Sequence, residues 1–207
     1  MSGRPVAFIT GAAHGQGRAV ALALAKEGHD VAALDVAAPL DYPGYGMGTP
    51  AELESLQGEI GALTLVADVR DDAAVKAAVE ETIERFGRID LLFNNAGICA
   101  YGLAHELTEA EWDAMLDINL KGAFIVGRHV IPHMIAAQRG SIHGTGSRLP
   151  ADRSAISRVV IPSSCARPSL SGVSTPVGWM ETTRMPWSAS SIAHDFVRPV
   201  SPHLLAA

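Results

Sequence analysis

Cysteine, excess positive charge and long hydrophobic runs are all scarce in this 207-residue sequence, and each shortage excludes a class of protein. The two cysteines, Cys99 and Cys165, lie in unrelated contexts, so we expect no disulfide framework and a reducing, cytoplasmic location. A formal net charge of −6 argues against a nucleic-acid partner. No apolar stretch is long enough to cross a bilayer or to form the core of a signal peptide, so we expect no membrane partner either.

The sequence does contain, up to about residue 143, an alternation of short apolar runs with amphipathic stretches, which is typical of βαβ units. The expected strands are residues 6–10, 30–35, 63–69, 90–97 and 140–147, and the expected helices are residues 17–28, 49–62, 71–87 and 108–137. Thr49 and Pro50 predict the start of the second helix, and Pro132 predicts a bend in the last one. We therefore predict an α/β fold, a Rossmann-like doubly wound parallel sheet with an incomplete or irregular C-terminal part.

Composition divides the chain into two parts. Residues 148–207 hold seven of the twelve prolines and six arginines but no lysine and no tyrosine. Proline removes backbone donors and serine competes for backbone partners, so this composition opposes helix and sheet interiors. We predict a Rossmann-like NAD-binding domain over residues 1–147 and an irregular or poorly ordered tail over residues 148–207.

A glycine-rich turn, "TGAAHGQG", joins the first expected strand to the first expected helix. The residues predicted to bind a dinucleotide here are Gly11, His14, Gly15, Gln16 and Gly17. Glycines let a pyrophosphate approach the backbone, and the N-terminus of the helix offers N–H groups and a positive dipole end. The alternative is an ordinary turn between a strand and a helix, which the acidic residue at the end of the next strand makes less probable.

Two acidic residues end the second and third expected strands. Asp35 can accept both hydroxyls of the adenosine ribose and would repel a 2′-phosphate, so the predicted cofactor is NAD and not NADP. Asp68 is predicted to accept the adenine amino group, with Val69 covering the ring. The alternatives are that Asp35 caps the following loop and that Asp68 caps a helix.

Four segments, "TGAAHGQG", "ADVRD", "NNAG" and "DINLKG", occur in an order that resembles the short-chain dehydrogenase/reductase family. The resemblance covers about residues 4–147 and implies a fold that moves a hydride between nicotinamide and an alcohol or ketone. The insert after Asp35, "NNAGICAYG" and "HVIPHMI" are similar to the mycofactocin-associated branch, which includes carveol dehydrogenases. Proteins of the family assemble into dimers or tetramers, which implies a homo-oligomer here, with the tetramer in doubt.

The resemblance also implies roles for single residues. It places Asn95, Ala96 and Gly97 beside the adenine ribose. Asn119 matches an asparagine of the catalytic tetrad, which stabilises a local break in the long helix and holds a water in a proton relay. Ser147 matches the serine that hydrogen-bonds the substrate oxygen, although "GTGS" could instead form a turn. No metal is expected, because the i, i+4 pair of His129 and His133 lacks an evident third ligand.

The acid–base pair of the family, a tyrosine followed four residues later by a lysine, is absent after Ser147. In that pair the lysine lowers the pKa of the phenol, which then takes the proton of the alcohol. We hypothesise that the reading frame slipped near residues 142–147; the alternative is a deletion that kept Thr175 of "SGVSTP" as a cofactor contact. Two functions follow as hypotheses. The first is an impaired NAD-dependent dehydrogenase of a small hydrophobic secondary alcohol or ketone, and the second is a catalytically silent dinucleotide-binding or interaction module.

Overall fold

The structure is a computed structural model that describes residues 3–41, 46–99, 103, 105–144 and 159–160. Ser147, Thr175 and all of the predicted tail except residues 159–160 lie outside these ranges. No helix within the described ranges is both long enough and apolar enough to cross a bilayer.

The described strands form one six-stranded sheet in the order β3-β2-β1-β4-β5-β6. The strands are β1 (Val6–Thr10), β2 (Asp30–Asp35), β3 (Leu63–Val66), β4 (Leu91–Asn94), β5 (Ser141–Gly144) and β6 (Val159–Val160). Each of the pairs from β3 to β5 is parallel, whereas β6 is antiparallel to β5. The Rossmann-like parallel sheet predicted from the alternation of strands and helices is therefore confirmed.

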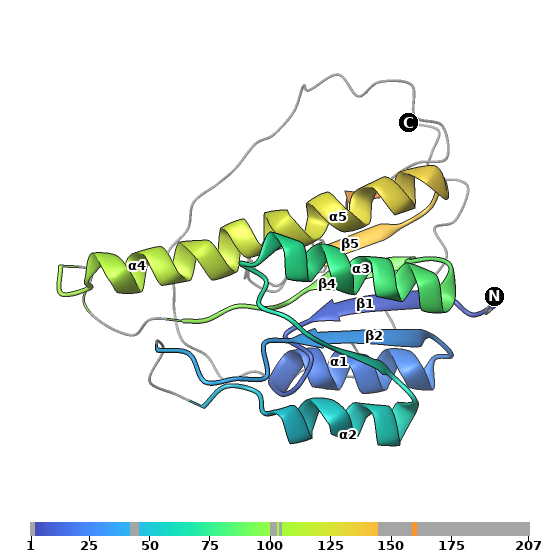
Figure 1. The fold of residues 1–207 in the computed structure, drawn as a ribbon, viewed down its shortest axis with the longest axis horizontal. Coiled ribbons are helices and arrows are strands. Elements are labelled where there is room, and N and C mark those ends of the chain that lie inside the picture. Colours follow the sequence, from blue (N-terminus) through green and yellow to red (C-terminus); the bar gives the residue numbers. More distant parts are fainter. Residues whose placement is uncertain (1–2, 42–45, 100–102, 104, 145–158, 161–207) are drawn as a thin grey trace, which may run out of the picture.

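Helices cover both faces of this sheet, as Figure 1 shows for α1 and α2 on one face and α3 and α5 on the other. The helical elements are α1 (Gly15–Lys26), α2 (Pro50–Ile60), α3 (Asp72–Phe86), α4 (Glu109–Leu116), the π-helical segment η1 (Asp117–Gly122) and α5 (Ala123–Ala136). Side chains of a strand alternate between the two faces, so Phe8 of β1 joins the core under α3 and α5, while Ala7 and Ile9 join the core under α1 and α2. All five residues of β1 are buried, as expected for a central parallel strand.

The ends of the helices follow from local hydrogen bonds. The Thr49 hydroxyl accepts from the backbone N–H of Glu52 at 3.2 Å, and the Glu52 carboxylate accepts from the backbone N–H of Thr49 at 2.8 Å. This capping box confirms Thr49 as the N-cap of α2, with Pro50 in the first turn. Gly61 and Gly87 end α2 and α3 at φ angles of 68° and 81°, where a side chain would be strained.

Several predicted boundaries were wrong. The third strand ends at Val66 and not at residue 69, because the chain turns at Asp68, whose backbone oxygen accepts from the N–H of Asp71 at 3.0 Å. The fourth strand covers Leu91–Asn94 and not residues 90–97, and the described part of the fifth covers Ser141–Gly144. The long helix contains the π-helical segment η1, and α5 continues through Pro132, so a bend at this proline does not end the helix.

Candidate nucleotide-binding site

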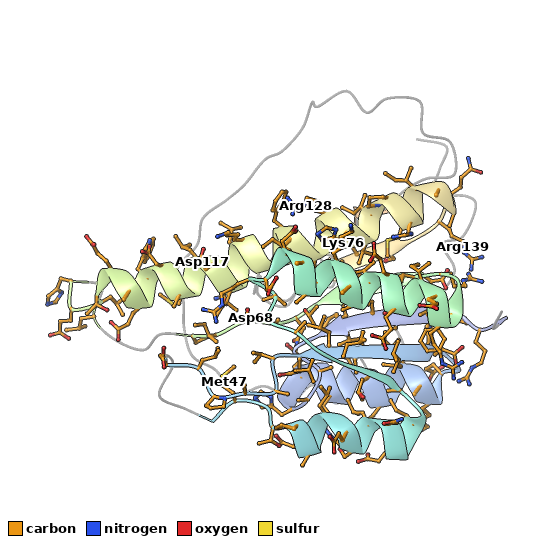
Figure 2. All side chains as sticks on the ribbon, in the orientation of Figure 1. Met47, Asp68, Lys76, Asp117, Arg128 and Arg139 are labelled. Carbon is orange, nitrogen blue, oxygen red and sulfur yellow. The ribbon has the colours of Figure 1, made fainter. Side chains whose placement is uncertain are left out.

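The carboxyl ends of the parallel strands meet at one edge of the sheet, and most of the predicted site residues gather there. Figure 2 shows Met47, Asp68 and Asp117 at this end of the molecule and Arg139 at the opposite end. Ligands of open α/β sheets bind in the crevice outside the carboxyl ends of the strands. The fold thus presents the predicted residues where a dinucleotide would bind.

The glycine-rich turn has the geometry that its sequence predicts. Gly11 and Gly15 have φ angles of 66° and 56°, in the region that favours glycine. A Cβ atom on Gly17 would lie 2.0 Å from the carbonyl oxygen of Gly11, so only glycine fits there. His14 is the N-cap of α1 without a side-chain capping bond, and the first turn of the helix itself holds no acidic residue, which favours an anion at its positive end. His14, Gly15 and Gln16 are exposed.

Thr10, which the sequence reasoning missed, joins this turn to the end of β4. Its buried hydroxyl accepts from the backbone N–H groups of Asn95 and Ala96, both at 2.9 Å. The side-chain amide of Asn95 donates to the carbonyl oxygens of Thr10 and Gly11 at 3.0 and 3.1 Å. Asn95 and Ala96 therefore lie against the glycine turn. The available signal was a polar residue ending an otherwise apolar strand.

Asp35 is buried at the end of β2, with 4% of its surface exposed. One carboxylate oxygen accepts from the backbone N–H of Ala13 and the other from that of Ala37, both at 2.9 Å. The residue therefore does cap the loop that follows it, the alternative considered from the sequence. Each oxygen retains a second lone pair for a ribose hydroxyl. A Cβ atom on Gly48 would lie 2.6 Å from the Cβ of Ala13 and 3.1 Å from Asp35 Oδ1, so the end of the insert lies over this carboxylate.

Asp68 and Val69 follow β3, and a second residue that the sequence reasoning missed, Arg70, holds the carboxylate. Asp68 accepts from the backbone N–H of Arg70 at 2.9 Å and from its Nε at 2.9 and 3.0 Å. Burial alone would raise the pKa of Asp68, but the hydrogen bonds and charge of Arg70 outweigh burial and hold the pKa below its ordinary value. Asp68 does not cap α3, whose N-cap is Asp71.

Asn119 lies in η1 and binds the segment that follows β4. Its side-chain oxygen accepts from the N–H of Ile98, and its side-chain nitrogen donates to the carbonyl oxygen of Ile98, each at 2.8 Å. A Cβ atom on Gly97 would lie 3.2 Å from Asn119 Oδ1, so Gly97 permits this close approach. Asn94 donates to the carbonyl oxygen of Ala123 at 2.8 Å and fastens β4 to the start of α5. The local break in the long helix that the resemblance implied is thus present at Asn119.

The structure does not bring the remaining candidate residues, Ser147 and the histidine pair, together within its described ranges. Ser147 lies outside them. His129 contacts Asp72, with 2.7 Å between Nε2 and Oδ1. Among the described residues, no group of three histidine, cysteine, aspartate or glutamate side chains is placed to hold a metal ion.

Comparison with known proteins places this geometry in a family. A family model described as short chain dehydrogenase matches residues 5–155. The (−)-trans-carveol dehydrogenase of Rhodococcus erythropolis is 39% identical over 141 residues, which cover 65% of this chain and 51% of that protein. A 3-oxoacyl-(acyl-carrier-protein) reductase of Thermotoga maritima is 40% identical over 143 residues, which cover 69% of this chain and 55% of that protein.

Solved structures agree with the sequence comparison. The crystal structure of carveol dehydrogenase from Mycobacterium avium in complex with NAD matches with a TM-score of 0.64 and 38% identity, covering 70% of this chain and 54% of that chain. This chain therefore spans about half the length of the relatives that it matches.

Proposed function

This chain belongs to the short-chain dehydrogenase family, and from that premise we propose that it binds NAD at the carboxyl ends of β1, β2 and β4. The observation that carries the proposal is the buried Asp35 carboxylate, hydrogen-bonded to the N–H of Ala13 inside the glycine-rich turn. A ribose seated on this carboxylate would place the neighbouring pyrophosphate at the N-terminus of α1. The negative charge of Asp35 would repel the 2′-phosphate of NADP, which supports NAD as the cofactor.

We assign the chain to oxidoreductases that transfer a hydride between nicotinamide and a small hydrophobic secondary alcohol or ketone. Support comes from relatives and structural neighbours named carveol dehydrogenase. Bound NAD would supply the ring that accepts the hydride. Of this chain's own residues, Asn119 would hold a water of the proton relay and Ser147 would hydrogen-bond the substrate oxygen. Since no tyrosine and no lysine follow Ser147, the proton of the alcohol lacks its usual acceptor and turnover is impaired.

Calorimetric titration of the full chain with NAD tests the proposal, with Asp35→Ala as the variant and Asp30→Ala as its matched control at the other end of β2. We expect binding by the native chain and by Asp30→Ala, and at least about tenfold weaker binding by Asp35→Ala, a loss of about 1.4 kcal/mol. Thermal unfolding of each variant checks that it is folded. A folded native chain without affinity for NAD would refute the proposal.

A catalytically silent nucleotide-binding module is the second candidate function, and the missing tyrosine and lysine favour it. The two candidates differ in one measurement. A burst of NADH absorbance with cyclic secondary alcohols identifies a dehydrogenase, whereas thermal stabilisation by NAD without turnover identifies a silent module.

We also propose that the chain resides in the cytoplasm, because its two cysteines fit a reducing compartment. We further propose that it forms a homodimer through its long helix. Large apolar side chains recur at every fourth position from α4 to α5 and are 41–67% exposed: Trp112, Leu116, Leu120 and Phe124. Such a stripe is typical of a helix that packs against a partner. Sedimentation equilibrium should detect a dimer that Leu120→Glu dissociates and that Val66→Glu, at the opposite edge of the sheet, leaves intact. A native chain that is monomeric at high concentration would contradict the dimer.

A further inference from the structure

The turn between β3 and α3 packs against η1, the segment that carries Asn119. Val69 in this turn is 6% exposed and belongs to the core under α3 and α5. A Cβ atom on Gly122 would lie 2.6 Å from Val69 Cγ2 and 3.1 Å from Val69 Cβ. Val69 therefore fits against η1 only because residue 122 has no side chain.

A charged contact at the start of α3 joins the turn to the long helix. Asp72, the first residue of α3, is paired with Arg128 of α5 and with His129, whose Nε2 is 2.7 Å from Asp72 Oδ1. On the other side of Val69, Arg70 binds Asp68, whose hydrogen bonds raise the pKa of Arg70; the charge of Asp117, the first residue of η1, raises it further. Figure 2 shows Asp68 below the long helix, with Asp117 and Arg128 on the helix above it. The turn is thus fixed along η1 and the start of α5.

The segment η1 is a π-helical turn between the α-helices α4 and α5. A π-helical turn is less stable than an α-helical turn and persists where side chains hold it. In η1 the holding contacts are the two hydrogen bonds between Asn119 and Ile98 and the fit of Gly122 against Val69. Any group that fixes Val69 therefore favours the register in which Asn119 binds Ile98.

The adenine of a bound nucleotide would be such a group, since Asp68 and Val69 are the residues predicted to receive it. The χ1 angle of a β-branched side chain is restricted, so a purine packed on Val69 would help to keep its Cγ2 against Gly122. We propose that Val69 is a positioning residue that couples occupancy of the adenine pocket to the π-helical register of η1, and thereby to the contact of Asn119 with Ile98. This inference rests on the proposed function, because it requires that the chain bind an adenine nucleotide.

Amide hydrogen exchange at Ile98 measures the coupling directly, because its N–H donates to Asn119 Oδ1. The probe is adenosine 5′-monophosphate, which contains the purine but no nicotinamide, added at saturation to the full chain. The variant is Val69→Ala, and the matched control is Val66→Ala, which removes a valine that is 70% exposed on the same segment. Calorimetry on each protein establishes the saturating concentration.

We expect the nucleotide to slow exchange at Ile98 about tenfold in the native chain and in Val66→Ala, and less than about twofold in Val69→Ala. Equal slowing in Val69→Ala at saturation would overturn the inference. If that variant does not fold, ribose 5-phosphate on the native chain decides the question. This ligand lacks the purine and should leave exchange within about twofold at saturation, whereas tenfold slowing would overturn the inference.

The same experiment separates this inference from the proposed function. Binding of the nucleotide without slower exchange at Ile98 in the native chain would overturn the coupling alone. No binding of either the nucleotide or NAD by the folded chain would overturn the proposed function and the coupling together.

Discussion

The nucleotide side of the site and its catalytic side differ in how their polar groups are held. On the nucleotide side, Thr10, Asp35 and Asp68 each engage two or more hydrogen-bonding groups through side chain or backbone. On the predicted catalytic side, Asn119 is the one predicted catalytic residue within the described ranges, and it is held by Ile98. The predicted nucleotide-binding residues all lie between Gly11 and Gly97, whereas the acid–base pair expected from the resemblance would follow Ser147. We therefore expect that nucleotide binding and turnover can be lost separately.

The largest expected effect is on turnover, which tests whether the catalytic side is as incomplete as the sequence indicates. We expect the native chain to oxidise cyclic secondary alcohols about 10²–10⁴-fold more slowly than a complete carveol dehydrogenase, the usual contribution of general acid–base catalysis. NADH absorbance, followed for both proteins with the same alcohol, makes the measurement. A rate near that of the complete enzyme would show that another group takes the proton.

The second prediction tests the nucleotide side at Thr10. Thr10→Val keeps the shape of the side chain but removes the acceptor for the N–H groups of Asn95 and Ala96. Two partly buried donors without partners should lower the free energy of unfolding by about 2 kcal/mol. Urea unfolding measures the loss. Thr10→Ser retains the hydroxyl and should lose less than about 1.5 kcal/mol; an equal loss in both variants would assign the effect to packing.

The third prediction concerns the contact between the two sides. Gly122→Ala forces a Cβ atom against Val69 and should lower the free energy of unfolding by about 2 kcal/mol. Gly127→Ala is the matched control in α5, where an added Cβ would meet Ile131 Cδ1 at 3.8 Å, an ordinary contact. This control should stabilise the chain by about 0.5–1 kcal/mol.

Combining Gly122→Ala with Val69→Ala should recover part of the stability that Gly122→Ala loses, because the nearest clashing atom, Val69 Cγ2, is removed. A double variant that loses the sum of the two single losses would indicate that the two residues do not interact. Chemical unfolding of all three variants provides the cycle.

The smallest expected effect is the acid dependence of Asp68. Its pKa is lower in the folded chain than the ordinary value of about 3.9, so its contribution to stability is complete above that pH and is lost as pH falls through the lower folded pKa. The pair with Arg70 is partly exposed, so the contribution is below about 1 kcal/mol. Thermal unfolding against pH should show a difference between the native chain and Asp68→Asn that shrinks below about pH 4. A difference that grows toward acid would contradict the assignment.

Local sequence patterns predicted the elements better than the contacts between them. The apolar runs of β1 and β2 and the N-cap Thr49 depend on neighbouring residues, and these predictions were confirmed. The role of Thr10 depends on Asn95, a residue 85 positions away that only the folded sheet brings near. Periodicity along the chain contains no information about such a pair.

The site residues show the same division. The glycine positions follow from the conformation of one turn, so the sequence alone identified them. Arg70 and Gly48 were missed because the sequence does not show which way the turn after β3 and the end of the insert fold back. The local break at Asn119 was expected only from the resemblance, because its partner Ile98 lies in a separate segment of chain.

The strand order has a consequence for synthesis of this protein. β1 lies between β2 and β4, and β4 is made about 80 residues after β1. At typical synthesis rates of about 5–20 residues per second, the edge of β1 that pairs with β4 remains unpaired for about 4–16 s. During that interval the apolar segment "VAFIT" has an unpaired edge, and protection by a chaperone would matter most then.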